Sequence, residues 1–547
     1  MIYDVIVVGG GIAGLMAAIE AKSDYNKVAI MTKGNLFKSN SSLASGGING
    51  TLNASDMKAI KQHIEDTIKG AYGLGDKKTI KYMCENAPKI IKQLVEFGVK
   101  FDRDENGNIL QRSFGGGSAK RTCYIGDKTG AEITQILIKI AKQKGIKFLV
   151  NHFVTNLTTL KNSVSGVVTI RRVDSSVVVY PAKSVILAGG GYAGIFRGHS
   201  TNAQDYTGDL LAIALRVGLH LKDMEFVQFH PTGFIKTNYL VSEAARGEGG
   251  LLINSKGESF VDELGPRDVV SRAIQNQIEN GQDVFLDLRH LSLETIEVKL
   301  PSLYKSAFMQ AGIDISKELL PIKPVAHYTM GGIEVDMVST DIKGLFACGE
   351  CASNGVHGAN RLGGNSLLEG AVFGALSGKE AQIYANSNEF LPIEFSNVIK
   401  DIKIVDTIFD SDTSKNFNAM RVSLGNTMFN NAGLIRDEES LNKAYDYIRY
   451  LRSEALSLHC VHKDRGNNVE LISILELRNA LEISQAVVMS ALKRKESRGA
   501  HYRKDYPYSD ESQMKSIVIR EVAKCQLEIW FKENWVLYKI RKWFYGI

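Results

Sequence analysis

A glycine-rich turn between an apolar run and a helical pattern constrains the fold of this chain more than any other feature. Residues 3–8 read YDVIVV, glycines follow at positions 9, 11 and 14, and a helical pattern continues to Ala21. In such a unit the first glycine permits a tight turn, the second lets the backbone approach a pyrophosphate, and the third lets the helix pack on the strand. The helix N-terminus also favours a phosphate. The segment therefore predicts a Rossmann-like dinucleotide-binding domain.

Two further glycine clusters indicate FAD rather than NAD. Residues 45–47 read SGG in an irregular stretch, and residues 188–191 read AGGG at the end of an apolar run. Backbone without side chains can lie close to a planar ring or a phosphate. The chain has 51 glycines but only nine prolines, which fits close backbone approach better than loose linkers. The run GLFACG at 344–349 looks like a buried strand that returns to the first domain, and a nucleotide site built from separated segments is more typical of FAD.

The remaining pattern predicts an α/β fold with an inserted domain and a helical C-terminal part. Helices are expected at 56–72, 76–97, 129–144, 416–431, 437–455, 470–496 and 513–543, and strands across 147–186. We expect an FAD-binding domain in two parts (1–233 and 342–395), an α+β capping domain (234–341), and a C-terminal helical domain (396–547) with a basic aromatic tail.

Composition excludes several classes of protein. The chain is 44% hydrophobic and 23% charged, as is usual for a soluble globular protein. Its six scattered cysteines indicate a reducing compartment. Because a strand is expected from the third residue and no apolar run of membrane-spanning length is visible, we expect neither a signal peptide nor a membrane-spanning helix. We expect a location in the cytoplasm, or at the cytoplasmic face of a membrane through partner subunits.

The end of the chain is basic and aromatic. Residues 491–547 contain 13 Lys and Arg against seven Asp and Glu, and they hold all three tryptophans. A helical subdomain with a solvated basic face is the favoured interpretation, and the tail from Trp530 to Ile547 is also a candidate surface for a partner. We expect no nucleic-acid partner.

Motifs across most of the chain resemble those of one enzyme family. They are QFHPTG (228–233), SEAARGEG (242–249), ELGPRD (263–268), HYTMGG (327–332), GEC (349–351), HGANRLGGNSL (357–367) and SRGAHYR (497–503). In this order they resemble the flavoprotein subunit of succinate dehydrogenase and fumarate reductase, and the related L-aspartate oxidase. The resemblance extends over about residues 5 to 510.

A dianionic four-carbon acid beside a flavin needs both carboxylates held while hydride passes to or from the flavin and a proton is exchanged at the other carbon. Imidazole and hydroxyl groups donate single hydrogen bonds, and guanidinium grips a carboxylate with two. The resemblance assigns substrate binding to His230, Ser242, His327 and Arg361. It implies that Arg267 donates the proton, that Glu243 and Arg246 relay protons from solvent, and that residues 234–341 close over the substrate.

A larger set of residues is expected to bind the cofactor. The acidic residue that usually meets the ribose about 20 residues after the glycine pattern is missing, so Thr32 and Glu350 are the candidates for that contact. The full set is Gly9, Gly11, Ile12, Ala13, Gly14, Thr32, Lys33, Ser39, Ser45, Gly46, Gly47, Ala188, Gly189, Gly190, Asp209, Glu350, Asn365, Ser366 and Leu367.

Asn40 departs from the pattern of the membrane-bound members. Those proteins usually tether FAD through a histidine six residues before the Gly-Gly pair, and the chain has asparagine there. Asparagine cannot form the link, so we expect noncovalent FAD. Loss of the tether should lower the flavin potential, which favours fumarate reduction over succinate oxidation.

Two other functions stay open. L-aspartate oxidase lacks the tether too, but it has a glutamate where this chain has Phe114, and phenylalanine offers nothing to a substrate ammonium group. A non-catalytic FAD-binding relative is disfavoured because every proposed catalytic residue is present. In the favoured interpretation, electrons pass to an iron–sulfur subunit and through it to a quinone or thiol partner.

Metal and dithiol chemistry are not expected within the chain. No cysteine cluster for an iron–sulfur centre is visible, and the spacing around His357 and His501 does not predict a metal site. Cys348 and Cys351 form a C-x-x-C pair, which we interpret as a turn that contacts the cofactor rather than as a redox dithiol.

Overall fold

A seven-stranded sheet forms the centre of the FAD-binding region in the computed structural model, which describes residues 1–547 except 204, 413–414, 524–525 and 533–547. Its strand order is β6-β2-β1-β9-β8-β7, and β16 also pairs with β9. The strands are β1 (Tyr3–Val8), β2 (Val28–Thr32), β6 (Lys147–Val150), β7 (His152–Leu160), β8 (Ser163–Arg171), β9 (Ser176–Leu187) and β16 (Leu345–Ala347). The predicted return of residues 344–349 to the first domain is confirmed, because Leu345 lies opposite Val185 in a parallel pair.

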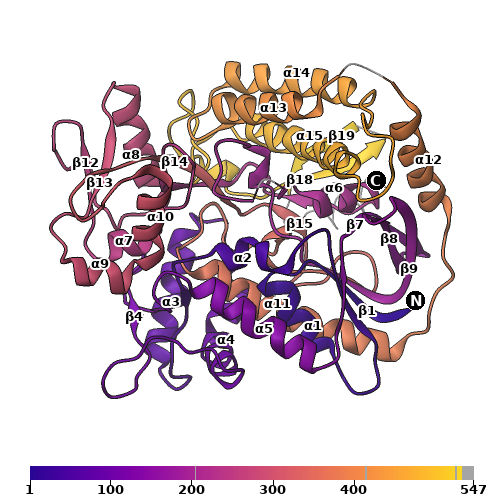
Figure 1. Ribbon diagram of the computed structural model, residues 1–547, viewed down its shortest axis with the longest axis horizontal. Helices are drawn as coiled ribbons and strands as arrows, with labels where there is room; N and C mark the ends of the chain where they lie inside the picture. Colours follow the sequence, from indigo (N-terminus) through magenta and orange to yellow (C-terminus); the bar gives the residue numbers. More distant parts are fainter. Residues whose placement is uncertain (204, 413–414, 524–525, 533–547) are drawn as a thin grey trace.

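Helices cover this sheet and lead to the site. They are α1 (Ile12–Ala21), α2 (Asn40–Leu43), α3 (Met57–Gly70), α4 (Lys77–Glu96), α5 (Thr129–Gln143), α6 (Asp209–Arg216) and α11 (Asn365–Ser387). Helix α1 packs against α11, so the glycine-rich turn at its start lies beside the segment that follows the HGAN motif (Figure 1). The helices expected at 56–72, 76–97 and 129–144 are confirmed within two residues at each end.

The segment 234–341, which we call the capping segment, lies at one side of the molecule (left in Figure 1). A four-stranded antiparallel sheet in the order β11-β14-β13-β12 joins it to the rest of the chain. Strand β11 (Val227–Phe234) leads into the segment, which contains α7 (Glu243–Gly247), β12 (Leu251–Asn254), α8 (Arg267–Glu279), β13 (Val284–Asp287), α9 (Leu293–Lys299), α10 (Pro301–Ala311) and β14 (Leu320–Thr329). The two long strands β11 and β14 carry two of the predicted substrate-binding residues, His230 and His327.

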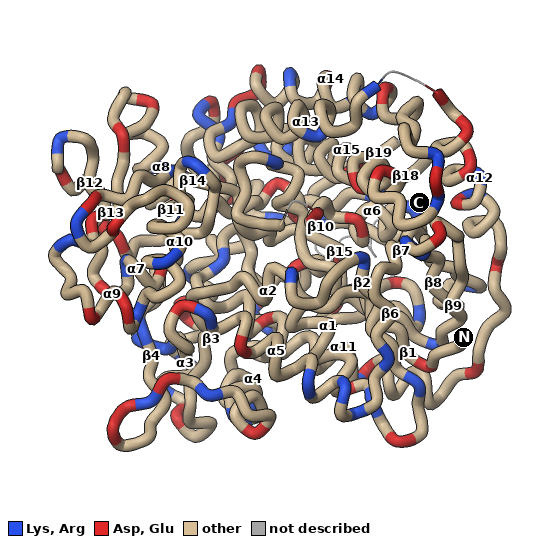
Figure 2. The backbone as a smooth tube through the Cα atoms, in the orientation of Figure 1, with Lys and Arg blue, Asp and Glu red and all other residues tan. Residues whose placement is uncertain are grey.

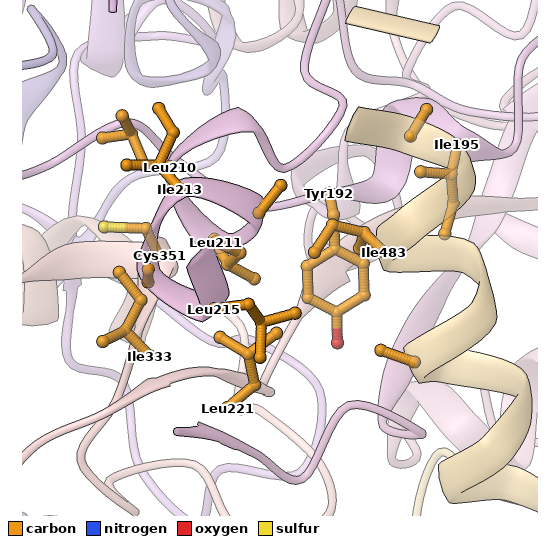
Figure 3. Packing of buried hydrophobic residues seen from close by; sticks show 14 of the residues in the cluster. Tyr192, Ile195, Leu210, Leu211, Ile213, Leu215, Leu221, Ile333, Cys351 and Ile483 are labelled. Carbon is orange, nitrogen blue, oxygen red and sulfur yellow. The ribbon is translucent and has the colours of Figure 1, made fainter. Parts of the chain in front are cut away.

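The C-terminal part begins with four helices, α12 (Ser396–Asp410), α13 (Phe417–Ala432), α14 (Glu438–Ala455) and α15 (Val469–Lys493). Basic and acidic residues are interspersed over these helices and the capping segment (Figure 2). Helix α15 packs on α6 through a buried apolar cluster, in which Ile483 lies beside Tyr192 and faces Leu211 and Leu215 (Figure 3). This cluster supports α6, whose first residue, Asp209, lines the cavity described below.

The expected helix at 513–543 is wrong over its described part. Residues 517–523 and 526–531 form a hairpin, β18 (Ile517–Ala523) and β19 (Gln526–Phe531), in a five-stranded sheet of order β17-β15-β10-β18-β19. The other members are β10 (Leu221–Lys222), β15 (Gly332–Glu334) and β17 (Ala352–Ser353). Ile519 pairs with Leu221 and is fully buried, so long-range strand pairing overrode the local helical tendency. Trp530 packs edge-on against His220, whereas Trp535 and Trp543 of the predicted tail lie outside the described residues.

Three short strands complete the described fold beside the sheet of the FAD-binding region. They are β3 (Ile48–Asn49), β4 (Gln111–Arg112) and β5 (Thr122–Cys123), in the order β3-β5-β4. None of the described helices is both long enough and apolar enough to cross a bilayer.

Candidate functional site

A large cavity opens along the carboxyl ends of β1, β2 and β9. It has a volume of about 660 Å³, within the usual range of small-molecule and cofactor sites. Fourteen of the predicted cofactor residues line it: Gly9, Gly11, Ile12, Ala13, Thr32, Lys33, Ser39, Ala188, Gly189, Gly190, Asp209, Glu350, Ser366 and Leu367. Chain segments far apart in sequence therefore converge on one site.

The glycine-rich turn that borders the cavity, at residues 9–14, is packed too closely for side chains at Gly9 and Gly14. Gly9 has a φ of +122°, and a Cβ atom there would lie 2.0 Å from the carbonyl oxygen of Ala188. A Cβ on Gly14 would lie 2.0 Å from the carbonyl oxygen of Gly9, so Gly14 faces the turn and not the cavity. These contacts match the packing roles expected of the first and third glycines of a dinucleotide fingerprint. The residues fit a bound dinucleotide.

Four other predicted cofactor residues lie away from the cavity lining: Ser45, Gly46, Gly47 and Asn365. A Cβ on Gly46 would meet the ring of Phe114, and one on Gly47 would meet the carbonyl oxygen of Cys123, so these glycines allow close packing within the protein. Asn365 is fully buried and bonds to Asn49 and His63.

Charged groups gather near the end of β2, where the acidic residue of the usual fingerprint is missing. The Lys33 ammonium lies 2.7 Å from an Asp209 carboxylate oxygen and 2.9 Å from Glu476 of α15. Glu350, which also lines the cavity, accepts a hydrogen bond of 3.0 Å from the backbone N–H of Thr329. Burial raises the pKa of Glu350 to about 7, although the Thr329 contact and Arg361 oppose the shift.

Asn40 also lines the cavity, and its side chain forms hydrogen bonds with a neighbouring loop of the cavity lining. Its side-chain NH₂ donates to Asn202, and its carbonyl oxygen accepts from the backbone N–H of Ala203 at 3.3 Å. Asn202 in turn donates to the backbone carbonyl of His327 at 2.7 Å. The residue at the tether position is therefore a polar link between α2 and the loop that supports His327.

A second group of predicted residues gathers beyond His327, which itself lines the cavity. The rings of His327 and His230 lie 5.1 Å apart at 66°. Burial and the nearby guanidinium of Arg267 hold the pKa of both histidines well below the usual value, so both imidazoles are neutral at pH 7. Ser242 caps α7 by accepting from the N–H of Ala244, which brings Glu243 and Arg246 into the same buried region.

Glu243 and Arg267 form a two-pronged ion pair at the centre of this group. Arg267 Nε and Nη2 donate to Glu243 Oε2 at 2.9 and 2.5 Å, and Gly115 N–H donates to Glu243 Oε1 at 2.6 Å. Burial opposes ionisation of Glu243, but Arg267 and Arg246 outweigh it and lower the pKa of the carboxyl. Arg246 donates to the backbone carbonyl of Glu263.

Glycines on the FAD-binding side make this pair possible. A Cβ on Gly363 would lie 2.8 Å from Glu243 Oε2 and 2.8 Å from a ring carbon of Phe114. A Cβ on Gly115 would lie 2.6 Å from Glu243 Oε1. The capping segment therefore meets the FAD-binding region at the Glu243–Arg267 pair, with Phe114 beside it.

Arg361, from the motif at residues 357–367, is the last predicted substrate-binding residue in this buried group. Its guanidinium carbon lies 4.3 Å from the ring centre of Tyr328, and the Tyr328 hydroxyl donates to Glu369 at 2.5 Å. Burial and Arg267 lower the pKa of Arg361 to about 10. The SRGAHYR motif braces the adjoining loop, because Ala500 N–H donates to the Ala359 carbonyl at 2.9 Å and Arg498 donates to the Tyr72 carbonyl at 2.7 Å.

The site carries more buried positive charge than negative. Among the described residues, the three guanidiniums of Arg246, Arg267 and Arg361 have a single carboxylate partner within 4 Å, Glu243. Arg246 Nε and Nη2 and Arg361 Nε are buried without a hydrogen-bond partner in the described structure. Buried charge and unpaired donors are costly, so the arrangement is suited to a ligand that brings two negative charges.

Sequence reasoning missed Gln228, which lies between two of these arginines. Its side-chain oxygen accepts from Arg267 Nη1 and from Arg361 Nη2, each at 3.1 Å. Gln228 and His230 are two residues apart on β11, so their side chains share a face of the strand. That alternation was the signal that could have found Gln228.

The remaining cysteine and histidine candidates have structural partners. Cys351 Sγ donates to the Leu187 carbonyl, and burial raises the pKa of its thiol to about 12. His357 lies 3.2 Å from Glu369, and His501 bonds to Arg436. Over the described part of the chain, no three His, Cys, Asp or Glu side chains are grouped to hold a metal ion.

Comparison with known proteins gives a consistent result. Residues 4–367 match the family model described as an FAD binding domain, and residues 421–537 match the C-terminal domain of fumarate reductase flavoproteins. The succinate dehydrogenase flavoprotein subunit of Rickettsia bellii is 38% identical over 92% of this chain and 90% of its own. A polypeptide of the CoM/CoB fumarate reductase of Methanothermobacter marburgensis is 38% identical over 96% of this chain and 98% of its own.

Solved structures agree with the sequence relatives. A chain of the E. coli quinol fumarate reductase superposes with a TM-score of 0.93 at 32% identity, covering 97% of both chains. A chain of Mycobacterium smegmatis Sdh1 superposes with a TM-score of 0.86 at 33% identity, covering 98% of this chain and 94% of that one. The predicted α/β fold class is confirmed.

Proposed function

Because the chain belongs to the family of FAD-dependent flavoprotein subunits of succinate dehydrogenases and fumarate reductases, we propose that it interconverts fumarate and succinate with noncovalently bound FAD. The observation that carries this proposal is the buried excess of two positive charges beside the cavity, formed by Arg246, Arg267 and Arg361 against Glu243. A dicarboxylate would balance both charges and pair the unpartnered guanidinium N–H groups.

The chain's own residues take distinct parts in the reaction. Bound FAD would supply hydride-transfer chemistry. In this proposal His230, His327 and Ser242 donate single hydrogen bonds to one carboxylate, and Arg361 grips a carboxylate with two. Because both imidazoles are neutral, each donates one hydrogen bond without adding charge to the site.

Arg267 is the proposed proton donor to the substrate carbon. An arginine is a weak acid, so it serves only if it is held close to that carbon and regains its proton quickly. Glu243 accepts two hydrogen bonds from Arg267, and because its carboxyl is ionised it is the proposed relay that takes up a proton from the solvent side and passes it to Arg267. Arg246 lies on the same short helix as Glu243 and is the proposed next member of the relay.

Phe114 favours this function over aspartate oxidation. Its ring is buried beside Gly363 and the Glu243–Arg267 pair, and it has no group to accept a hydrogen bond from a substrate ammonium. The Glu243 carboxylate next to it is already engaged by Arg267 and Gly115. The oxidase alternative is therefore not favoured.

Assays with two substrates test the proposal. With reduced viologen as electron donor, the FAD-loaded chain should reduce fumarate, and with aspartate and oxygen it should form no peroxide. Both reactions are followed by absorbance, with FAD-free protein as the control. Peroxide formation from aspartate, without fumarate reduction, would contradict the proposal and establish the oxidase.

Noncovalent FAD gives a separate expectation. Acid precipitation of the purified protein should release all of the yellow flavin into the supernatant, because Asn40 has no ring nitrogen with which to bond the flavin. The absorbance of pellet and supernatant measures this directly. Flavin retained in the pellet after washing would show a covalent link through another residue.

Electron partners complete the proposal. We propose that an iron–sulfur subunit exchanges electrons with the flavin, and that a quinone-reactive or thiol-reactive subunit lies beyond it. Relatives of this chain are named as flavoprotein subunits of larger enzymes. One example is the flavoprotein subunit of the 8-methylmenaquinol:fumarate reductase of Wolinella succinogenes. Without a covalent tether the flavin potential should be lower, which supports fumarate reduction as the physiological direction.

A further inference from the structure

The proposed function depends on Arg267 and Arg361. Among the described residues, Gln228 is the one neutral side chain that forms hydrogen bonds with both of these arginines. It is completely buried, and all four hydrogen-bonding positions of its amide are used. The oxygen accepts from Arg267 and Arg361, while Nε2 donates to the Asn360 side chain and to the Arg361 carbonyl, each at 2.7 Å. Such a saturated amide has a single orientation, so its oxygen must face the two guanidiniums.

The network continues on both sides of the site. Asn360 donates to Asp268 at 2.8 Å, and Asp268 follows Arg267 at the start of α8 in the capping segment. Gln228 itself lies on β11, and Arg361 lies in the loop of the FAD-binding region. One amide therefore joins the proton donor, the carboxylate-gripping arginine and the junction between the two parts of the molecule.

The bridge is neutral, and this matters physically. Two guanidiniums held by one acceptor repel each other, and Arg267 is among the causes that lower the pKa of Arg361. A carboxylate in the position of Gln228 would hold the same two arginines more strongly but would cancel one of the two excess charges. An amide oxygen fixes their spacing and leaves both charges for a ligand.

We propose that Gln228 is a positioning residue that sets the preference of the site for doubly charged acids over singly charged ones. It does so by holding Arg267 and Arg361 together without neutralising them. This inference rests on the proposed function, because it assigns a role within the same site.

An isosteric charge change tests the inference. The probes are fumarate and crotonate, a four-carbon acid of the same trans shape with one carboxylate, and their dissociation constants are measured on the FAD-loaded full chain from the flavin absorbance. In Gln228→Glu the buried excess falls from two charges to one. We expect fumarate binding to weaken by at least about tenfold and the preference for fumarate over crotonate to fall by a similar factor. A purely structural role would weaken both ligands equally.

Two further variants secure the interpretation. Gln228→Met removes the bridge without adding charge. It should also weaken fumarate more than crotonate, since the two charges of fumarate depend on the placement of both guanidiniums, whereas the single charge of crotonate can be balanced by one. Gln485→Glu is the matched control, because Gln485 is a buried glutamine on α15 that accepts from Arg452, remote from the site. It should leave the preference unchanged.

The outcomes separate this inference from the proposed function. A wild-type protein whose flavin responds to neither fumarate nor succinate would end the proposed function. A wild-type protein that reduces fumarate, combined with an unchanged fumarate-to-crotonate preference in both Gln228 variants at normal FAD content, would overturn the role of Gln228 alone.

Discussion

Replacement of Arg267 by alanine should reduce fumarate–succinate turnover by at least about a thousandfold while leaving FAD bound. General acid catalysis contributes roughly a hundredfold to ten-thousandfold, and the change also removes a buried charge from the proposed substrate site. Arg267 does not line the cofactor cavity, so flavin content and its visible spectrum should stay normal. Turnover with reduced viologen, divided by flavin content, measures the effect.

The control for this variant is Arg289→Ala. Arg289 also belongs to the capping segment and bonds to an acidic residue, Asp287, but it is 46% exposed and outside the buried pair. Its removal should leave turnover within about twofold, because exposed ion pairs contribute little. An Arg267→Ala protein that retains a substantial part of the wild-type rate would remove Arg267 from the role of proton donor.

Replacement of Gly9 by alanine should abolish FAD binding and lower stability strongly. The new Cβ would lie 2.0 Å from the carbonyl oxygen of Ala188 and 2.5 Å from its carbonyl carbon, and these are backbone atoms directly after β9 of the central sheet. The φ of +122° adds strain for any residue with a side chain. Either the glycine turn or the end of β9 must move, and both border the cavity. Flavin content and thermal unfolding measure the result.

Gly145→Ala separates strain from collision in this experiment. Gly145 also has a positive φ, +72°, but a Cβ there would meet no atom within 4 Å. The variant should lose only about 1 kcal/mol of unfolding free energy and keep its flavin. Equal behaviour of the two variants would show that backbone strain, and not the closeness of Ala188, explains the effect at Gly9.

Local pattern predicted the parts of the fold whose signals are short in range. The glycine turn, the strands of the central sheet and the helices α3, α4 and α5 are encoded in the periodicity of their own residues. The hairpin β18–β19 was not predictable in this way, because its strands exist through pairing with Leu221, about 300 residues earlier in the chain. The same limit applied to Gly46 and Gly47, since a glycine pair does not reveal whether it faces a ligand or, as here, Phe114 and Cys123.

The sequence by itself determined the family, the fold class and the chemical types of the site residues, because glycine turns and motif order are properties of the chain. Only the tertiary structure decided the charge balance. It brought Arg246, Arg267 and Arg361 around one carboxylate, Glu243, and it placed the Gln228 amide between two of them. The physical reason is that electrostatic energy depends on distance and burial. Residues from separate parts of the sequence become close and buried together only when the capping segment packs on the FAD-binding region.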